Sequence, residues 1–293
     1  MPPDAIVILI FMTFIAAFVN GALGYGFSSV TLPVALIYYT NKTLNPALVL
    51  VEIILNGHVL WIHRESLPKI FRRILPIFWG LFPMILMGGY ILSSARPDLI
   101  KLCTYVILIP LALFQAAGVR WPIRSEKKAL PLLGGGVGLL YSVTTISGPP
   151  LALFLNNQGF SKSEFKSALG LIRMVQALLA ALVYFYLGLY QVSHITLSAF
   201  ILPGIVLAIP LGAGAVRNIG TETFRRIAMS FDAWIISFGL ARLLIYLNLF
   251  SNIQAYSIMA TVIGIDLFLL SRYFVIKARH SSASRSLHGA QEE

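Results

Sequence analysis

Long apolar segments separated by short polar connections make up most of this chain. The runs at 5–19, 74–92, 99–118, 195–216 and 258–270 each contain at most one charged residue. A helix needs about 20 apolar residues to cross the ~30 Å hydrocarbon core of a bilayer. The pattern therefore predicts an all-α polytopic membrane protein.

The apolar segments follow the same order in two halves of the chain. Each half has one interrupted segment and then three uninterrupted helices, at 5–40, 44–63, 74–94 and 99–118 in the first repeat (1–118) and at 129–157, 167–190, 194–216 and 227–250 in the second (129–250). A linker at 119–128 joins them, and one extra transmembrane helix (251–277) and a tail (278–293) follow. Matching residues recur 117 positions apart (Gly21 and Gly138, Pro33 and Pro150) and then 127 apart (Pro76 and Pro203, Pro83 and Pro210), which indicates an internal repeat.

The first segment of each half is interrupted by residues that do not suit a helix interior. Residues 20–29 read NGALGYGFSS and residues 142–150 read SVTTISGPP. Glycine costs about 1 kcal/mol and proline about 3 kcal/mol inside a helix. We therefore expect both helices to be broken at these positions.

The distribution of Lys and Arg predicts how the segments cross the membrane. If all nine segments cross, the connecting Lys and Arg residues divide into 8 on one side and 12 on the other. If both interrupted segments are re-entrant hairpins, 17 fall on one side and only Lys42, Arg96 and Lys101 on the other. Because Lys and Arg accumulate on the cytoplasmic side, the second arrangement is favoured. It predicts two inverted repeats, an N-terminus outside and a C-terminus in the cytoplasm.

Composition excludes several classes of protein. The chain is 58% apolar and only 11% charged, whereas soluble domains carry roughly 25% charged residues. The net charge of +11 comes from the connections, so no basic face for nucleic acid is expected. Cys103 is the only cysteine, so we expect no internal disulfide and no cysteine metal site. We also expect no cofactor. The start of the chain lacks a positive leader region, so we expect the first apolar run to be retained.

Both interruptions carry hydroxyl side chains that suit an anion. Half-helix ends near the bilayer midplane supply partial charges in secondary transporters, and N-terminal helix amides attract anions. The expected substrate-binding hydroxyls are Tyr25, Ser28, Ser29 and Thr31 in the first half and Ser142, Thr144, Thr145 and Ser147 in the second. The alternative is that these small residues only allow close helix packing.

Glu52 and Arg173 occupy corresponding positions in the two halves, 121 residues apart. If the two halves are inverted, these residues lie at equal depths counted from opposite faces of the membrane. We therefore expect the two side chains to meet near its centre. Arg173 would then neutralise an anionic substrate, and Glu52 would orient it or carry a coupled proton. Asn56 and Gln176, one turn further on, are expected polar neighbours at the substrate. A purely structural ion pair, or an Arg173 that extends to the cytoplasm, is the alternative.

The remaining ionisable residues are weaker candidates. We expect Asp232 and Arg242 to extend toward the membrane surfaces, and His58 to be a packed neutral side chain. His63 and His194 are expected at the interfaces. A proton-relay role for Asp266 stays open.

At Gly24-Tyr25-Gly26-Phe27-Ser28-Ser29 with Pro33, and again at Ser147-Gly148-Pro149-Pro150, the sequence resembles the TauE/SafE family of sulfite exporters. The similarity covers most of residues 5–250. It implies transport of small sulfur-containing or carboxylate anions across the cell membrane, driven by the proton gradient. Fewer consecutive glycines are present here than is usual in the family, so the identity of the anion stays open.

The sequence thus predicts a secondary active transporter of small anions that is not an enzyme. Its expected partners are the anion, protons, the lipid bilayer and, where it assembles, further copies of itself. No ATP-binding loop of the Gly-x-x-x-x-Gly-Lys type is present. A passive anion channel is the nearest alternative. An intramembrane hydrolase using Ser147 with His58 or His194 is a more distant one, since it needs serine and histidine within hydrogen-bond reach.

Overall fold

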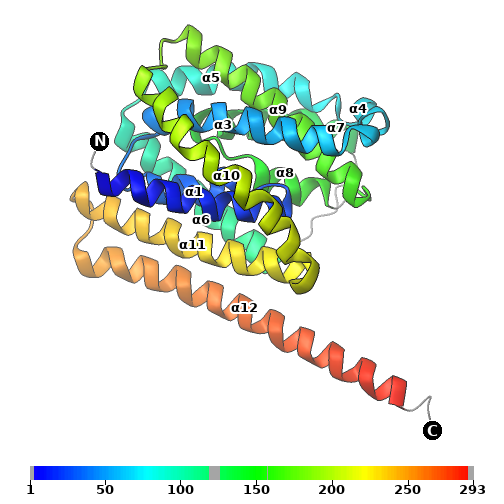
Figure 1. The fold of residues 1–293 in the computed structure, drawn as a ribbon. Coiled ribbons are helices and arrows are strands. Elements are labelled where there is room, and N and C mark those ends of the chain that lie inside the picture. Colours follow the sequence, from blue (N-terminus) through cyan, green and yellow to red (C-terminus); the bar gives the residue numbers. More distant parts are fainter. Residues whose placement is uncertain (1–2, 119–125, 157, 290–293) are drawn as a thin grey trace.

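The computed structural model describes residues 3–118, 126–156 and 158–289. Throughout these residues the regular structure is helical. The helices lie roughly side by side in one bundle (Figure 1).

The helices are described by the two halves that the sequence predicts. The first half contains α1 (Pro3–Leu23), α2 (Phe27–Ala35), α3 (Asn41–Ile62), α5 (Ile77–Ser94) and α6 (Pro97–Ala117), with the short η1 (Arg64–Ser66) and α4 (Leu67–Ile74) between α3 and α5. The second half contains α7 (Glu126–Thr144), α8 (Gly148–Leu155), α9 (Lys162–Tyr186), α10 (Val192–Ile219) and α11 (Thr221–Tyr246), and α12 (Asn252–Gly289) follows.

Seven of the described helices are long and apolar enough to cross a membrane: α3, α5, α6, α9, α10, α11 and α12. In α12 the apolar span is Asn252–Lys277, in agreement with the expected extra segment. The helix itself continues to Gly289, so the expected tail at 278–293 begins as a continuation of this helix.

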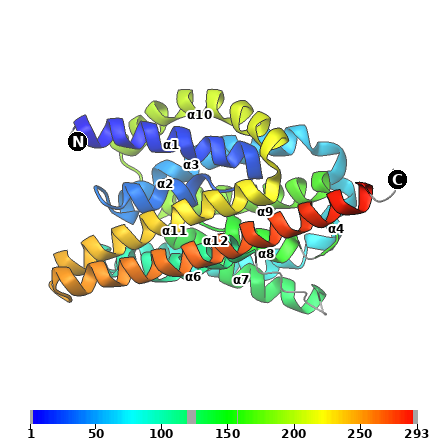
Figure 2. The same cartoon turned by 90° about the horizontal axis from the view of Figure 1, so that it is seen from below.

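The helices α2 and α8 are too short to cross a bilayer. They contain 9 and 8 residues, and at 1.5 Å per residue this gives about 14 and 12 Å. Helix α2 packs against α1, the helix that precedes it. The start of α1 and the end of α12 lie at opposite ends of the bundle in both views (Figures 1 and 2).

The two halves pack on each other in a reciprocal way. The first helix of one half packs on the third long helix of the other, since α1 lies along α10 and α7 lies along α5. Glycines bring these backbones together. A β-carbon added to Gly21 would collide with the carbonyl oxygen of Ile209, and one added to Gly138 would stand 2.9 Å from that of Leu81. The matching positions Gly21 and Gly138 therefore serve the same packing purpose in the two helix pairs.

Candidate functional site

Glycines with left-handed backbone angles break the first interrupted segment. Gly24 has φ 83° and Gly26 has φ 110°, and α2 begins directly after them. An L-residue with a side chain rarely adopts these angles. The expected break within 20–29 is confirmed at Gly24–Gly26.

The second interrupted segment breaks at Thr145, which has φ 56° although it is not glycine. The side chain of Thr144 supports the turn by accepting a hydrogen bond of 3.2 Å from the amide of Ile146. Proline lies in the first turn of α8, where its missing N–H and fixed φ are well tolerated. The expected break within 142–150 is confirmed as well.

The two breaks are in direct contact. A β-carbon added to Gly148, the first residue of α8, would stand 2.9 Å from Cβ of Tyr25. The side chain of Gln115 joins the same two segments: its Oε1 accepts from the Tyr25 hydroxyl at 3.0 Å, and its Nε2 donates to the carbonyl of Pro149 at 2.6 Å. Helix α6 therefore ties the breaks of both halves together.

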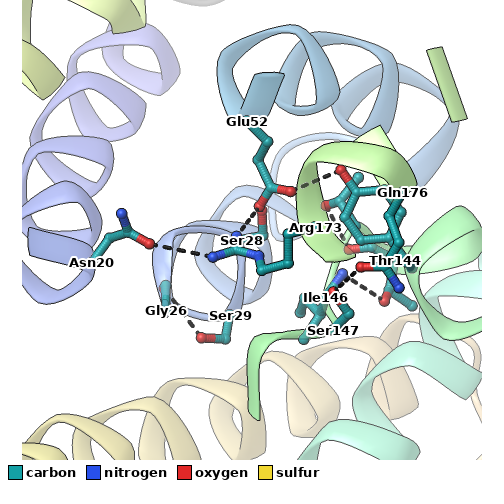
Figure 3. Close-up of polar contacts among 12 residues, drawn as sticks. Asn20, Gly26, Ser28, Ser29, Glu52, Thr144, Ile146, Ser147, Arg173 and Gln176 are labelled. Carbon is teal, nitrogen blue, oxygen red and sulfur yellow. Dashed lines mark hydrogen bonds and ion pairs between the residues drawn. The ribbon is translucent and has the colours of Figure 1, made fainter. Parts of the chain in front are cut away.

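Beside the breaks, Arg173 on α9 forms an ion pair with Glu52 on α3, with 2.7 Å between Nη2 and Oε1. Both side chains are buried, with 3% and 0% of their surface exposed. Figure 3 shows the Arg173 guanidinium between Asn20 and Ser28 of the first half and Ser147 and Gln176 of the second. The meeting of Glu52 and Arg173 that the repeat predicts is confirmed, and an Arg173 that extends to the membrane surface is excluded.

Three groups donate to the carboxylate of Glu52. Besides Arg173, the Ser28 hydroxyl donates to Oε1 at 2.5 Å and the Tyr141 hydroxyl donates to Oε2 at 2.8 Å. Charge-assisted hydrogen bonds of this kind are stronger than those between neutral groups. The carboxylate is thus held between α2, α7 and α9.

The guanidinium is less completely satisfied than the carboxylate. Arg173 Nη1 lies 3.5 Å from Asn20 Oδ1, and Arg173 Nε has no partner in the described part of the chain. The buried Asn56 Nδ2 and Thr31 Oγ1 likewise have no hydrogen-bond partner among the described residues. Asn56 lies one turn beyond Glu52, and Thr31 lies one turn beyond Ser28. A buried polar group without a partner costs about 1–3 kcal/mol, so these atoms retain hydrogen-bonding capacity that the described residues do not use.

The structure places the other predicted hydroxyls mostly in local hydrogen bonds. Ser29 donates to the carbonyl of Gly26, Ser142 to Leu139, Thr144 to Leu140 and Thr145 to Thr144, and Ser147 donates to Oε1 of Gln176 at 2.6 Å. Four of these bonds run to a backbone carbonyl one to four residues earlier in the chain. Ser147 and Gln176 instead form a link from the second break to α9, one turn from Arg173.

Sequence reasoning missed Asn20, Tyr141 and Gln115 as residues of this site. Each is a buried side chain that carries a hydrogen-bonding group. That was the only available signal, since the contacts of these residues depend on the packing of the two halves.

Two expectations about ionisable residues are wrong. Asp232 does not extend to a membrane surface: it is 2% exposed, and its Oδ1 has no hydrogen-bond partner among the described residues. His58 is exposed on the outer side of α3 rather than packed, because α3 turns the opposite face, with Glu52 and Asn56, toward the other half. Arg242 is exposed, as expected.

Asp266 accepts hydrogen bonds from Ser230 at 2.9 Å and from Trp234 at 2.8 Å. These contacts dock α12 on α11. His63 lies at the end of α3, where its Nδ1 is 3.2 Å from the hydroxyl of Ser163. The side chain of His194 lies outside the described residues.

Among the described residues, no group of three or more His, Cys, Asp and Glu side chains could hold a metal ion. Comparison with curated proteins and with solved structures gives no match. One family model, described as Sulfite exporter TauE/SafE, matches residues 9–238.

Proposed function

The chain belongs to the TauE/SafE family of sulfite exporter-like membrane transporters, and we propose that it is a secondary active transporter of small anions. The substrates proposed are sulfite, sulfonates or short carboxylates, carried across the cell membrane. The observation that carries this proposal is the buried Arg173, which lies between two broken helices with part of its hydrogen-bonding capacity unused.

The proposed architecture is two inverted repeats, each a re-entrant hairpin followed by three crossings. Three observations support it: α2 and α8 are too short to cross, α2 packs back on α1, and the halves pack reciprocally. With seven crossings, the ends of the chain lie on opposite sides of the membrane. The Lys and Arg distribution supports an N-terminus outside and a C-terminus in the cytoplasm.

The proposed binding site uses the unpartnered donors. An oxyanion beside Arg173 would accept hydrogen bonds from Arg173 Nε, Asn56 Nδ2 and Thr31 Oγ1. The N-termini of α2 and α8 both begin at the breaks, so their amide dipoles would favour the same negative charge. Such half-helix ends at a repeat interface are a recurring transporter feature.

Glu52 is the proposed coupling residue. The Glu52 carboxylate and a substrate anion would compete for the same guanidinium. Protonation of Glu52 would remove this competition, so proton binding and anion binding would each strengthen the other, as linkage requires. Ser28 and Tyr141 would keep the protonated side chain in place.

The test is flux through the purified protein in proteoliposomes, with sulfite and an imposed pH gradient. A coupled carrier should saturate and should accumulate the anion against its gradient. Arg173→Gln should abolish this accumulation, whereas Arg72→Gln, at an exposed arginine on α4, should retain it. Non-saturating flux that never runs uphill would indicate the passive channel instead.

A further inference from the structure

A cavity of about 530 Å³ lies where the end of α1 meets the connection after α3 and the start of α9. We name it the vestibule. Leu23, His63, Lys162, Ser163, Lys166 and Thr221 are among its lining residues. It lies on the face where η1 and α4 place Arg64, Lys69, Arg72 and Arg73. This is the Lys- and Arg-rich face of the protein.

The charge of the vestibule is one-sided. Lys162 and Lys166 both line it, and no Asp or Glu is found among its described lining residues. Neither lysine has an ion-pair partner within the described ranges of the chain. A concave surface lined by one sign of charge raises the local concentration of oppositely charged solutes. The vestibule is therefore suited to small anions.

Lys166, which lines this cavity, lies against the first break. Its methylene carbons stand 3.5–3.9 Å from the position that a β-carbon of Gly24 would occupy. The absence of a side chain at Gly24 leaves this space to the lysine. The amide of Gly24 donates to the carbonyl of Asn20 at 2.7 Å, and the side chain of Asn20 contacts Arg173. Gly24, which contacts Lys166, is thus hydrogen-bonded to Asn20, which contacts Arg173.

We propose that the vestibule is the entry for anions on the Lys- and Arg-rich face, and that Lys166 binds a small oxyanion before it reaches Arg173. This inference rests on the proposed transport function. Lysine suits a transient site, because its ammonium is a compact point charge on a flexible stem, without the bidentate geometry of arginine. The ligand class is a sulfite, sulfonate or carboxylate group small enough to pass the break.

The attraction of anions to the vestibule can be tested with a single reporter thiol. In a Cys103→Ser background, Ser163→Cys places one cysteine in the vestibule, and Thr221→Cys provides a second reporter on its α11 wall. The rates of modification by a sulfonate-bearing and by a trimethylammonium-bearing methanethiosulfonate are compared. Each rate is divided by the rate of the same reagent with a free thiol in solution. On this scale the anionic reagent should react about tenfold faster than the cationic one. Methanesulfonate should slow the reaction.

Lys166→Gln, added to either reporter, should remove most of this charge preference. Lys69→Gln is the matched control, because it removes the same charge from an exposed position on the same face that does not line the cavity. In transport, Lys166→Gln should raise KM about fivefold at low salt and less at high salt, since screening weakens the attraction. Lys69→Gln should leave KM unchanged.

The outcomes separate the two proposals. If both reporters show equal rates for the two reagents, or if Lys166→Gln and Lys69→Gln behave alike, the vestibule inference is wrong even when the protein transports anions. If the charge preference depends on Lys166 and methanesulfonate protects the reporters, the inference stands. A protein that moves no anion under any gradient would instead overturn the proposed function.

Discussion

Gly148 packs directly on Tyr25, so the two broken segments touch. A β-carbon added to Gly148 would lie 2.9 Å from the β-carbon of Tyr25. This contact joins the first and second halves of the chain at their breaks. Both residues belong to the short stretches that the sequence marks as unsuitable for helix. The close approach therefore depends on the absence of a side chain at one position.

Gly148→Ala should destabilise the protein and reduce transport. The added methyl group must displace Tyr25 or α8, and overpacking of this kind costs about 1–3 kcal/mol. Thermal unfolding in detergent and sulfite flux would measure both effects. Gly136→Ala is the control, since no atom lies within 4 Å of its added carbon, and it should change neither. Equal stability of the two variants would contradict the close contact.

Glu52→Gln should make the stability of the protein depend on added anions. Without the carboxylate, Arg173 is a buried cation with no counterion, and breaking a buried pair costs about 3–5 kcal/mol. An anion that binds the folded state recovers part of this loss. Methanesulfonate should therefore raise the melting temperature of Glu52→Gln more than that of the wild type or of the exposed control Glu65→Gln. The same rise in all three proteins would mean that the anion binds elsewhere.

The pKa of His63 should respond to Lys166. Burial, and then the charge of Lys166, hold the pKa of His63 below its usual value near 6.5. The folded chain therefore binds this proton less readily than the unfolded chain does. The stability associated with neutral His63 is complete above the unfolded pKa and decreases as the pH falls below it. Lys166→Gln should raise the His63 pKa in an NMR titration, and Lys69→Gln should not. An unchanged value in Lys166→Gln would contradict the proximity of the two groups.

Trp234→Phe should weaken the docking of α12. The indole Nε1 donates to the buried carboxylate of Asp266 at 2.8 Å, and the loss leaves one carboxyl oxygen without its donor. Hydrogen bonds between membrane helices average about 0.6 kcal/mol, so we expect a loss of this size in thermal unfolding. Trp79→Phe is the control, because Trp79 is 80% exposed. Comparable losses in both variants would show that indole volume, and not the hydrogen bond, matters.

The sequence predicted the breaks and the ion pair because both depend on local or repeated features. Glycine and proline act on the backbone where they stand, so the positions of the breaks follow from composition alone. The pairing of Glu52 with Arg173 followed from their equal places in the two halves. Neither inference needed knowledge of the helix packing.

The surroundings of these features could not be predicted in the same way. Asp232 and His58 were assigned to the wrong environment because the rotation of α11 and α3 about their axes is set by their neighbours. Tyr141 and Gln115 reach the site only because α7 and α6 lie next to helices of the other half. Such contacts join residues 89 and 90 positions apart, and no sequence period marks them.

The glycine contacts of α1 with α10 and of α7 with α5 bear on how a carrier of this shape could work. Where two helix backbones are in contact, no flexible side chain lies between them that could change conformation as one helix slides along the other. We expect each of these pairs to travel as one rigid body. Alternating exposure of Arg173 to the two aqueous compartments would then come from a rocking of whole helix pairs about the junction of α3 and α9, and not from the separation of either pair.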